Sequence, residues 1–304
     1  MQRQPVVFDN ISALMERVGL PSPLHPLITL VNYDENKPSL ADAGSQYLLY
    51  FYKIAFKLRF NGKAKYGPGS YDFRDGGLAF VGPNQIVQLS DDLGEHEGYA
   101  LYFHPDLLYK HPLASRISRY GFFSYSVSEA LFLSEKEKNV IKSVFESIAA
   151  ELSTQTDHFS LAVLVSQIEL LLHHCDRFYN RQFLTRNVVH HDLIDQMNMF
   201  LNDRLNNEAA LISGLPTTQE IAQYLKVSPR YLSDMLKSLT GHTTQQHIHL
   251  KMVEKAKEML GRDRLTTAEV AYALGFEHPQ SFNKLFKHKT GMSPAAFRKL
   301  LNPN

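Results

Sequence analysis

Two short polar stretches hold side chains that can bind the edges of DNA bases. Arginine or lysine can pair with guanine, glutamine or asparagine with adenine, and aspartate can accept a hydrogen bond from cytosine. The candidates for base reading are Arg230, Ser233 and Asp234 in the first stretch and Pro279, Gln280, Asn283 and Lys284 in the second. The candidates for phosphate contacts, which hold register without reading sequence, are Ser228, Lys237, Lys287 and Lys289.

An internal repeat places these two stretches at matching positions. Residues 217–222 (TTQEIA) match residues 266–271 (TTAEVA) at an offset of 49 residues. After one inserted residue the offset becomes 50, and the match continues from 229–241 to 279–291. One supersecondary unit therefore occurs twice in the chain.

Each copy of the repeat predicts two short helices joined by a tight turn. A Thr-x-x-Glu capping box, at Thr217 and again at Thr266, opens the first helix of each copy. The turns fall at Lys226 and at Gly275, and glycine adopts the left-handed backbone that such a turn needs more readily than lysine does. Two helices joined in this way form a helix-turn-helix, whose second helix enters the major groove of DNA.

A third predicted helix, over residues 244–260, separates the two copies. Its length is about 25 Å at 1.5 Å per residue, and successive major-groove segments on one face of DNA lie about 34 Å apart. A rigid spacer of this size could place the two reading helices in adjacent major grooves of one site. If the spacing is too short, either the DNA bends or one unit does not bind. The alternative is an interaction module that binds no DNA, because any short helix pair with a glycine turn imitates the motif.

The N-terminal part of the chain predicts β structure. Residues 47–60 alternate with period two, with apolar side chains on one face and Lys53 and Lys57 on the other. Glycine and proline separate further short apolar runs without helical crossovers, which indicates an antiparallel sandwich or small barrel. Four side chains of this region either line a ligand pocket or belong to the ordinary core and surface. They are Tyr50, Tyr52, Phe56 and Arg74.

Two helices are predicted after the strands. The first opens with a capping box at Ser134 and Glu137, and the second begins near Ser160. The second helix carries an apolar seam with the spacing of a helix that packs along another helix. This seam either covers the sheet or forms a dimer interface, and its residues are Leu161, Leu164, Ile168, Leu171 and Cys175.

The C-terminal repeat resembles the AraC/XylS family of transcription regulators over about residues 192–301. The similarity is strongest in residues 271–297, through the AxxLGF, SF, FK and TGMSPxxF motifs. Two positions depart from the family: Met252, where arginine is common, and Asp234, where a neutral or basic residue is more frequent. The resemblance implies a sequence-specific regulator that binds double-stranded promoter DNA as a homodimer, with RNA polymerase and a small-molecule effector as further partners.

Residues and resemblance together predict an α+β chain. Residues 1–183 are expected to form a cupin-like antiparallel β-barrel with two packing or dimerisation helices, which senses and dimerises. Residues 184–191 are expected to form a linker, and residues 192–304 an all-α domain of two helix-turn-helix units joined by a linker helix. The net charge of +4 on residues 186–304, against −3 on residues 1–185, suits a basic C-terminal binding domain.

Other classes of chemistry find little support in the sequence. Residues 67–85 contain no histidine, the residue that cupin enzymes use to bind metal, and His173, His174 and Cys175 are consecutive and cannot face one another on a helix. No nucleophile elbow, P-loop or dinucleotide fingerprint is present. We expect no enzyme activity, metal or cofactor, the alternative being a cupin-type enzyme fused to a DNA-binding domain. The lack of a long apolar run or signal peptide, with a single cysteine, predicts a cytoplasmic protein.

Overall fold

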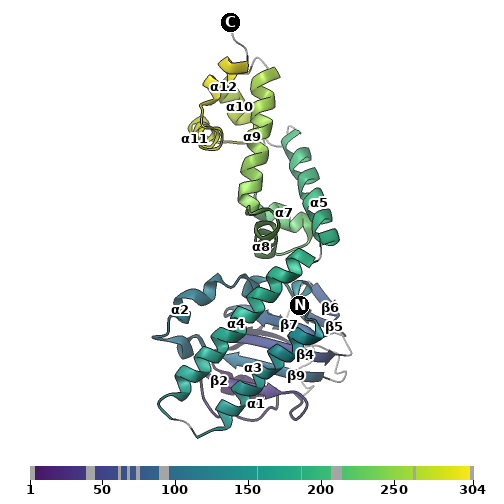
Figure 1. The fold of residues 1–304 in the computed structure, drawn as a ribbon, viewed down its shortest axis with the longest axis vertical. Coiled ribbons are helices and arrows are strands. Elements are labelled where there is room, and N and C mark those ends of the chain that lie inside the picture. Colours follow the sequence, from purple (N-terminus) through teal and green to yellow (C-terminus); the bar gives the residue numbers. More distant parts are fainter. Residues whose placement is uncertain are drawn as a thin grey trace. The chain divides into compact units, whose positions relative to one another are not determined.

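The computed structural model divides the chain into two compact units, Met1–Gln182 and Phe183–Asn304, each of which is described by itself (Figure 1). The structure describes residues 4–38, 45–60, 63–66, 69–72, 76–88, 96–155, 157–185, 187–206, 214–262 and 265–301.

The described residues of the first unit form three sheets. One has the order β1 (Val6–Phe8), β3 (Gln46–Leu49), β8 (Gln85–Gln88); the second has the order β2 (Ile28–Asn32), β9 (His96–Phe103), β4 (Tyr52–Phe60), β7 (Gly77–Val81); the third is the hairpin of β5 (Lys63–Tyr66) and β6 (Gly69–Asp72). The expected antiparallel barrel is corrected in two ways. Among the described residues the sheets do not close into a barrel, and β1 pairs with β3 in parallel.

The stretch predicted as one strand over residues 47–60 is two strands in different sheets. Tyr47 and Leu49 are buried in β3, whereas Ile54 and Phe56 are buried in β4, so the buried positions change from odd to even between the strands. The reason is that the chain crosses from one sheet to the other at residues 50–51. A single period-two pattern therefore spans two different environments.

Helices α3 and α4 cover one face of the four-stranded sheet, whereas α1 packs on the other face. Phe145 stacks on Phe56 of β4 and on Tyr99 of β9, with ring centroids 5.6 Å apart in both pairs. Helices α3 and α4 lie across this sheet (Figure 1). The helical segments are α1 (Ile11–Arg17), η2 (Pro105–Leu108), α2 (Leu113–Arg116), η3 (Ile117–Arg119), η4 (Gly121–Ser124), η5 (Val127–Glu129), α3 (Glu135–Ser153) and α4 (Ser160–Thr185).

The predicted seam of the second helix lies on α4. Leu164, Ile168, Leu171 and Cys175 are buried within the chain, and Leu161, at the start of the helix, is 46% exposed. The capping box predicted at Ser134 and Glu137 is present at the start of α3. Four of the five seam residues thus pack inside the unit that carries them.

The second unit is helical, with α5 (Asn187–Asn206), α7 (Thr218–Leu225), α8 (Pro229–Thr240), α9 (Thr244–Arg262), α10 (Thr267–Ala273), α11 (Pro279–Thr290) and α12 (Pro294–Leu301). Within this unit, α7 and α8 pack near one end of α9, and α10, α11 and α12 near the other (Figure 1). The described residues of the predicted linker, 184–191, belong to the end of α4 and the start of α5 rather than to an extended segment.

The two turns of the repeat have the backbone that the sequence predicts. Lys226 has φ 57° and Gly275 has φ 88°, both in the left-handed region. A residue with a side chain pays about 1–2 kcal/mol of conformational energy in this region. Glycine avoids that strain, but it loses about 0.5–1 kcal/mol more in backbone entropy on folding. Lys226 therefore stores a small strain that Gly275 avoids.

Lys226→Gly is expected to raise the free energy of unfolding of the helical unit by about 0.5–1 kcal/mol, and Gly275→Ala to lower it by about 1 kcal/mol or more. Urea unfolding of the full chain, followed by circular dichroism at the helical band, measures both. The two variants serve as each other's control. A shift of both in the same direction would contradict the assignment of strain to the turn of the first copy.

Candidate DNA interface

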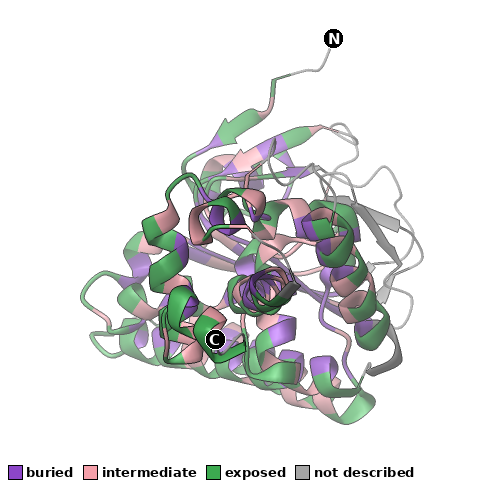
Figure 2. Cartoon of the chain, turned by 90° about the horizontal axis from the view of Figure 1, so that it is seen from above, coloured by how far each residue is buried: buried purple, intermediate pink, exposed green. Residues whose placement is uncertain are grey.

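Helix α8 separates its buried face from its exposed face cleanly. Tyr231, Leu232, Met235 and Leu236 are at most 6% exposed and face the interior of the unit. The predicted reading residues Arg230, Ser233 and Asp234, together with Lys237, recur at helical spacing on the opposite face, where they are exposed or half-buried. The structure therefore brings the first set of predicted residues together on one helix face (Figure 2 shows burial by colour).

The N-terminal turn of α8 is fixed from several directions. The Ser228 side chain accepts a hydrogen bond from the Tyr231 backbone N–H at 3.2 Å. The Tyr231 hydroxyl lies 3.2 Å from Nε2 of His190, whose Nδ1 lies 2.8 Å from the carbonyl oxygen of Phe183. The Phe183 ring also meets the Tyr231 ring edge-on at 5.3 Å. Ser228 thus caps α8, and its side chain holds the helix start.

His190 is a residue that the sequence reading missed. It falls within residues 184–191, which the sequence predicts to be a linker, yet it is 1% exposed and lies between Phe183 and Tyr231. No spacing rule could find it, because its partners are 7 and 41 residues away along the chain.

Helix α11 presents a second polar face. Phe282 and Phe286 are buried, with ring centroids 5.7 Å apart, and they fix the inner side of the helix. The predicted reading residues Gln280, Asn283 and Lys284 are exposed, as is Lys287, while Pro279 and Lys289 are half-buried. The helix begins at Pro279 and its N-cap residue, His278, makes no side-chain cap bond.

The two second helices end in the same way. Gly241 and Gly291 follow α8 and α11 with φ 77° and 79°. The preceding threonines, Thr240 and Thr290, each donate a hydrogen bond of 2.8 Å to the backbone carbonyl four residues back. The sequence repeat is therefore a structural repeat, down to the bonds that close its helices.

The first helix of each copy is capped as predicted. Thr217 and Glu220 form a reciprocal capping box on α7, and Thr266 and Glu269 form one on α10. Hydrogen bonds from Thr266, first from its backbone N–H and then from its side chain, lower the pKa of the Glu269 carboxyl below its usual value. These charge-assisted bonds fix where the helices that precede the two turns begin.

Charge differs between the two polar faces. On α8, Arg230 and Asp234 form an ion pair at 2.9 Å, whereas the last turn of α11 carries Lys287, His288 and Lys289. Burial first, and then the positive charge of Lys289, lower the pKa of His249 on α9. The second copy therefore offers more positive charge for phosphates than the first.

Helix α9 supports both copies through one apolar stripe. Ile248, Met252, Val253, Ala256 and Leu260 are at most 6% exposed. Met252, where the family commonly has arginine, is a core residue here. The interaction at this position is therefore apolar packing.

The structure describes three of the four residues of the predicted ligand pocket in the first unit. Phe56 is fully buried against Phe145, Tyr52 stacks on Phe103 at 4.8 Å, and Tyr50 is 40% exposed. Arg74 lies outside the described residues. The other three side chains line neither of the two cavities described below.

A cavity lies on the opposite face of β4, between the sheets. It has a volume of about 50 Å³ and is lined by apolar side chains of α1 and by Tyr33, Tyr47, Tyr102 and Lys53. Lys53 is 9% exposed, and its Nζ lies 5.4 Å from the centre of the Tyr102 ring. Burial, and then the positive charge of Lys53, lower the pKa of Lys57 on the same strand to about 7. The lysine face of β4 is therefore an interior face.

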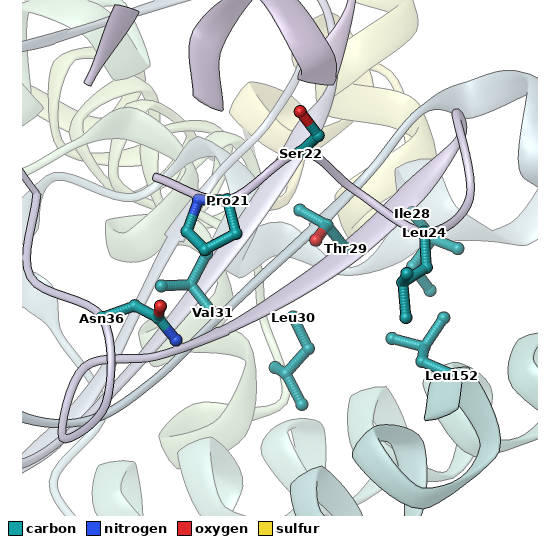
Figure 3. A pocket seen from close by; sticks show the side chains of 9 residues that line it. All are labelled: Pro21, Ser22, Leu24, Ile28, Thr29, Leu30, Val31, Asn36 and Leu152. Carbon is teal, nitrogen blue, oxygen red and sulfur yellow. The ribbon is translucent and has the colours of Figure 1, made fainter. Parts of the chain in front are cut away.

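A larger hollow of about 310 Å³ runs along β2. Figure 3 shows Leu152, at the end of α3, beside Leu24 and Ile28, with Pro21 and Asn36 at the other end of the hollow. Its walls carry no charged side chain among the described residues.

Within the described ranges, no three histidine, cysteine, aspartate or glutamate side chains gather in a group that could hold a metal ion. In the same ranges, no helix has the length and apolar character needed to cross a membrane.

Comparisons with known proteins concern mainly the C-terminal unit. A family model described as a helix-turn-helix domain matches residues 221–300. The chain is 35% identical over 85 residues to the uncharacterized HTH-type transcriptional regulator YobQ of Bacillus subtilis, a match that covers 28% of this chain and 35% of YobQ. It is 22% identical over 256 residues to YfiF of the same organism, also an uncharacterized HTH-type transcriptional regulator, over 82% of this chain and 77% of YfiF.

Among solved structures, the C-terminal domain of AraT, a response regulator from Geobacillus stearothermophilus, is similar at 26% identity and a TM-score of 0.31. That match covers 36% of this chain and 84% of the AraT chain.

Proposed function

We propose that this chain, whose C-terminal unit carries an AraC-type helix-turn-helix domain, is a sequence-specific DNA-binding transcription regulator. The observation that carries the proposal is the doubled unit: α8 and α11 each bury one face and present base-reading chemistry on the other. The helices that precede them, α7 and α10, open with matching capping boxes, and α8 and α11 end at matching glycines.

We also infer that a small molecule bound in the first unit controls the regulator. The cavity beside Lys53 supports this, since it combines apolar walls with one cationic group. A water needs about 10–15 Å³ of such volume, so the cavity of about 50 Å³ suits a ligand of a few heavy atoms. The favoured class is a short carboxylate.

We further propose that the regulator is a homodimer whose two chains meet through the exposed surface of α4. Its inner seam is buried within the chain, whereas Val163 and Leu170, seven residues apart and on one face, are 38% and 48% exposed. Contact with RNA polymerase would belong to the same DNA-bound state.

Arg230→Ala and Lys284→Ala are each expected to weaken binding to the preferred duplex by about 1–3 kcal/mol, because each removes a base contact. Lys287→Ala should instead weaken binding to all duplexes alike and reduce the slope of log affinity against log salt by about 0.9. The preferred duplex is selected from a randomised library with the full chain, and affinities are measured by fluorescence anisotropy at several salt concentrations.

Lys136→Ala, on the exposed start of α3, is the matched control for loss of one positive charge and should bind like wild type. Wild-type protein that binds no duplex, or all duplexes equally, contradicts the proposed function. Unchanged preference in both Arg230→Ala and Lys284→Ala contradicts the assignment of the reading residues.

Propanoate is expected to raise the melting temperature of the full chain, and propan-1-ol is not, because only the carboxylate complements the ammonium group in the cavity. Lys53→Met should remove the effect of propanoate while it keeps the side-chain volume. An equal effect of propanoate on wild type and on Lys53→Met would show that it binds elsewhere.

Leu170→Glu is expected to shift the sedimentation equilibrium of the full chain towards monomer, because the charge would be buried in a dimer contact. Ala150→Glu, at an exposed position of α3, is the control for the same charge added outside α4. A dimer that Leu170→Glu leaves intact would place the interface elsewhere.

A further inference from the structure

The two polar residues of opposite charge on the outer face of α8 bind each other. Nε of Arg230 donates a hydrogen bond of 2.9 Å to Oδ2 of Asp234, one helical turn later. The Arg230 side chain is 47% exposed and the Asp234 side chain 28% exposed. The carboxylate is therefore the more sheltered partner, and the guanidinium is the one that reaches outwards.

Helix stability does not account for this arrangement. Pairs four residues apart are more favourable when the acid precedes the base, and here the base comes first. A cation in the first turn of a helix also opposes the helix dipole, which favours negative charge at that end. Arg230 is the second residue of α8, and Asp234 lies in its middle. Swapping the two residues would stabilise the helix more, so helix stability does not explain their order.

The second copy of the repeat lacks this pair. At the repeat offset of 50 residues, Gln280 corresponds to Arg230 and Lys284 to Asp234. Both are exposed on α11. The ion pair therefore belongs to the first reading helix and is not a requirement of the fold.

We propose that Asp234 is a positioning residue that holds the Arg230 guanidinium for recognition of one guanine. This inference rests on the proposed function, in which α8 reads bases. The carboxylate takes the Nε side of the planar guanidinium, which directs the two terminal nitrogens, Nη1 and Nη2, towards O6 and N7 of guanine. Asp234 thus acts through Arg230, and its negative charge is tolerated near DNA because it is paired.

The backbone beneath the pair is well suited to such positioning. Arg230 and Asp234 flank the buried residues Tyr231 and Leu232, and the Ser228 cap fixes the first turn. A long arginine side chain loses rotational freedom when it binds DNA, and a partner that fixes it beforehand reduces this cost.

The test compares full-chain wild type with Asp234→Ala, Asp234→Asn, Arg230→Ala and the double variant Arg230→Ala/Asp234→Ala. The probe is the duplex selected by wild type, in which each guanine in turn is replaced by 7-deazaguanine, which lacks the N7 acceptor. The guanine read by Arg230 is the one whose replacement weakens wild type but leaves Arg230→Ala unchanged.

Asp234→Ala is expected to lose about tenfold of the preference for that guanine over adenine, equivalent to one such contact. Asp234→Asn should retain part of it, since its amide oxygen still accepts from Nε. The double variant should bind no worse than Arg230→Ala alone, because the acid has no role without its arginine. Circular dichroism of each variant confirms that α8 is folded.

Two outcomes overturn the inference. If Asp234→Ala loses a preference for cytosine at another position while the guanine preference stays, Asp234 reads a base itself. If Asp234→Ala binds every duplex more tightly with unchanged preference, its carboxylate only repels phosphate. In contrast, wild type that selects no sequence at all overturns the proposed function, so the two failures are distinguishable.

Discussion

The packing of α9 against the short helices on either side of it is the interaction on which the helical unit depends. Short helices of 7 to 12 residues, such as α7, α8, α10 and α11, are marginal on their own and gain most of their stability from burying one face. The stripe on α9 that runs from Ile248 to Leu260 supplies the surface against which they do so. Because the inner faces are fixed in this way, the outer faces of α8 and α11 are presented in a defined orientation. Any reading of DNA by these helices rests on that apolar contact.

Local chemistry made the helical unit largely predictable from the sequence. A capping box needs only residues three apart, and those at Thr217 and Thr266 are both present, as is the one at Ser134 in the first unit. The strained turn at Lys226 followed from the repeat, because its counterpart is a glycine. The sequence also permits the ion pair of Arg230 with Asp234, since these residues are four apart on a helix, although each is predicted only as a separate base reader.

Non-local contacts explain what the sequence could not provide in the first unit. Alternation along residues 47–60 indicates that neighbouring side chains face opposite ways, but it does not say what each face meets. In β4 both faces are covered, one by Phe145 of α3 and the other by the second sheet, so Lys53 is an interior residue. The parallel pairing of β1 with β3 likewise joins segments some forty residues apart, from Val6 to Tyr47, and no local pattern specifies it. The burial of His190 could not be predicted from the sequence for the same reason, since its partner Tyr231 lies 41 residues away.

The unequal charge of the two reading faces suggests that the two copies contribute differently to DNA binding, one to affinity and the other to base discrimination. Attraction between lysines and phosphates is strong at a distance and weakens with salt, whereas a hydrogen bond to a base edge acts only at contact. The last turn of α11, with Lys287 exposed and Lys289 half-buried, suits the first kind of interaction. On α8, Arg230 is neutralised by Asp234, so this helix adds less to the attraction but holds a guanidinium in a fixed geometry. The second copy would then supply most of the salt-dependent affinity, and the first copy would supply discrimination that salt affects less.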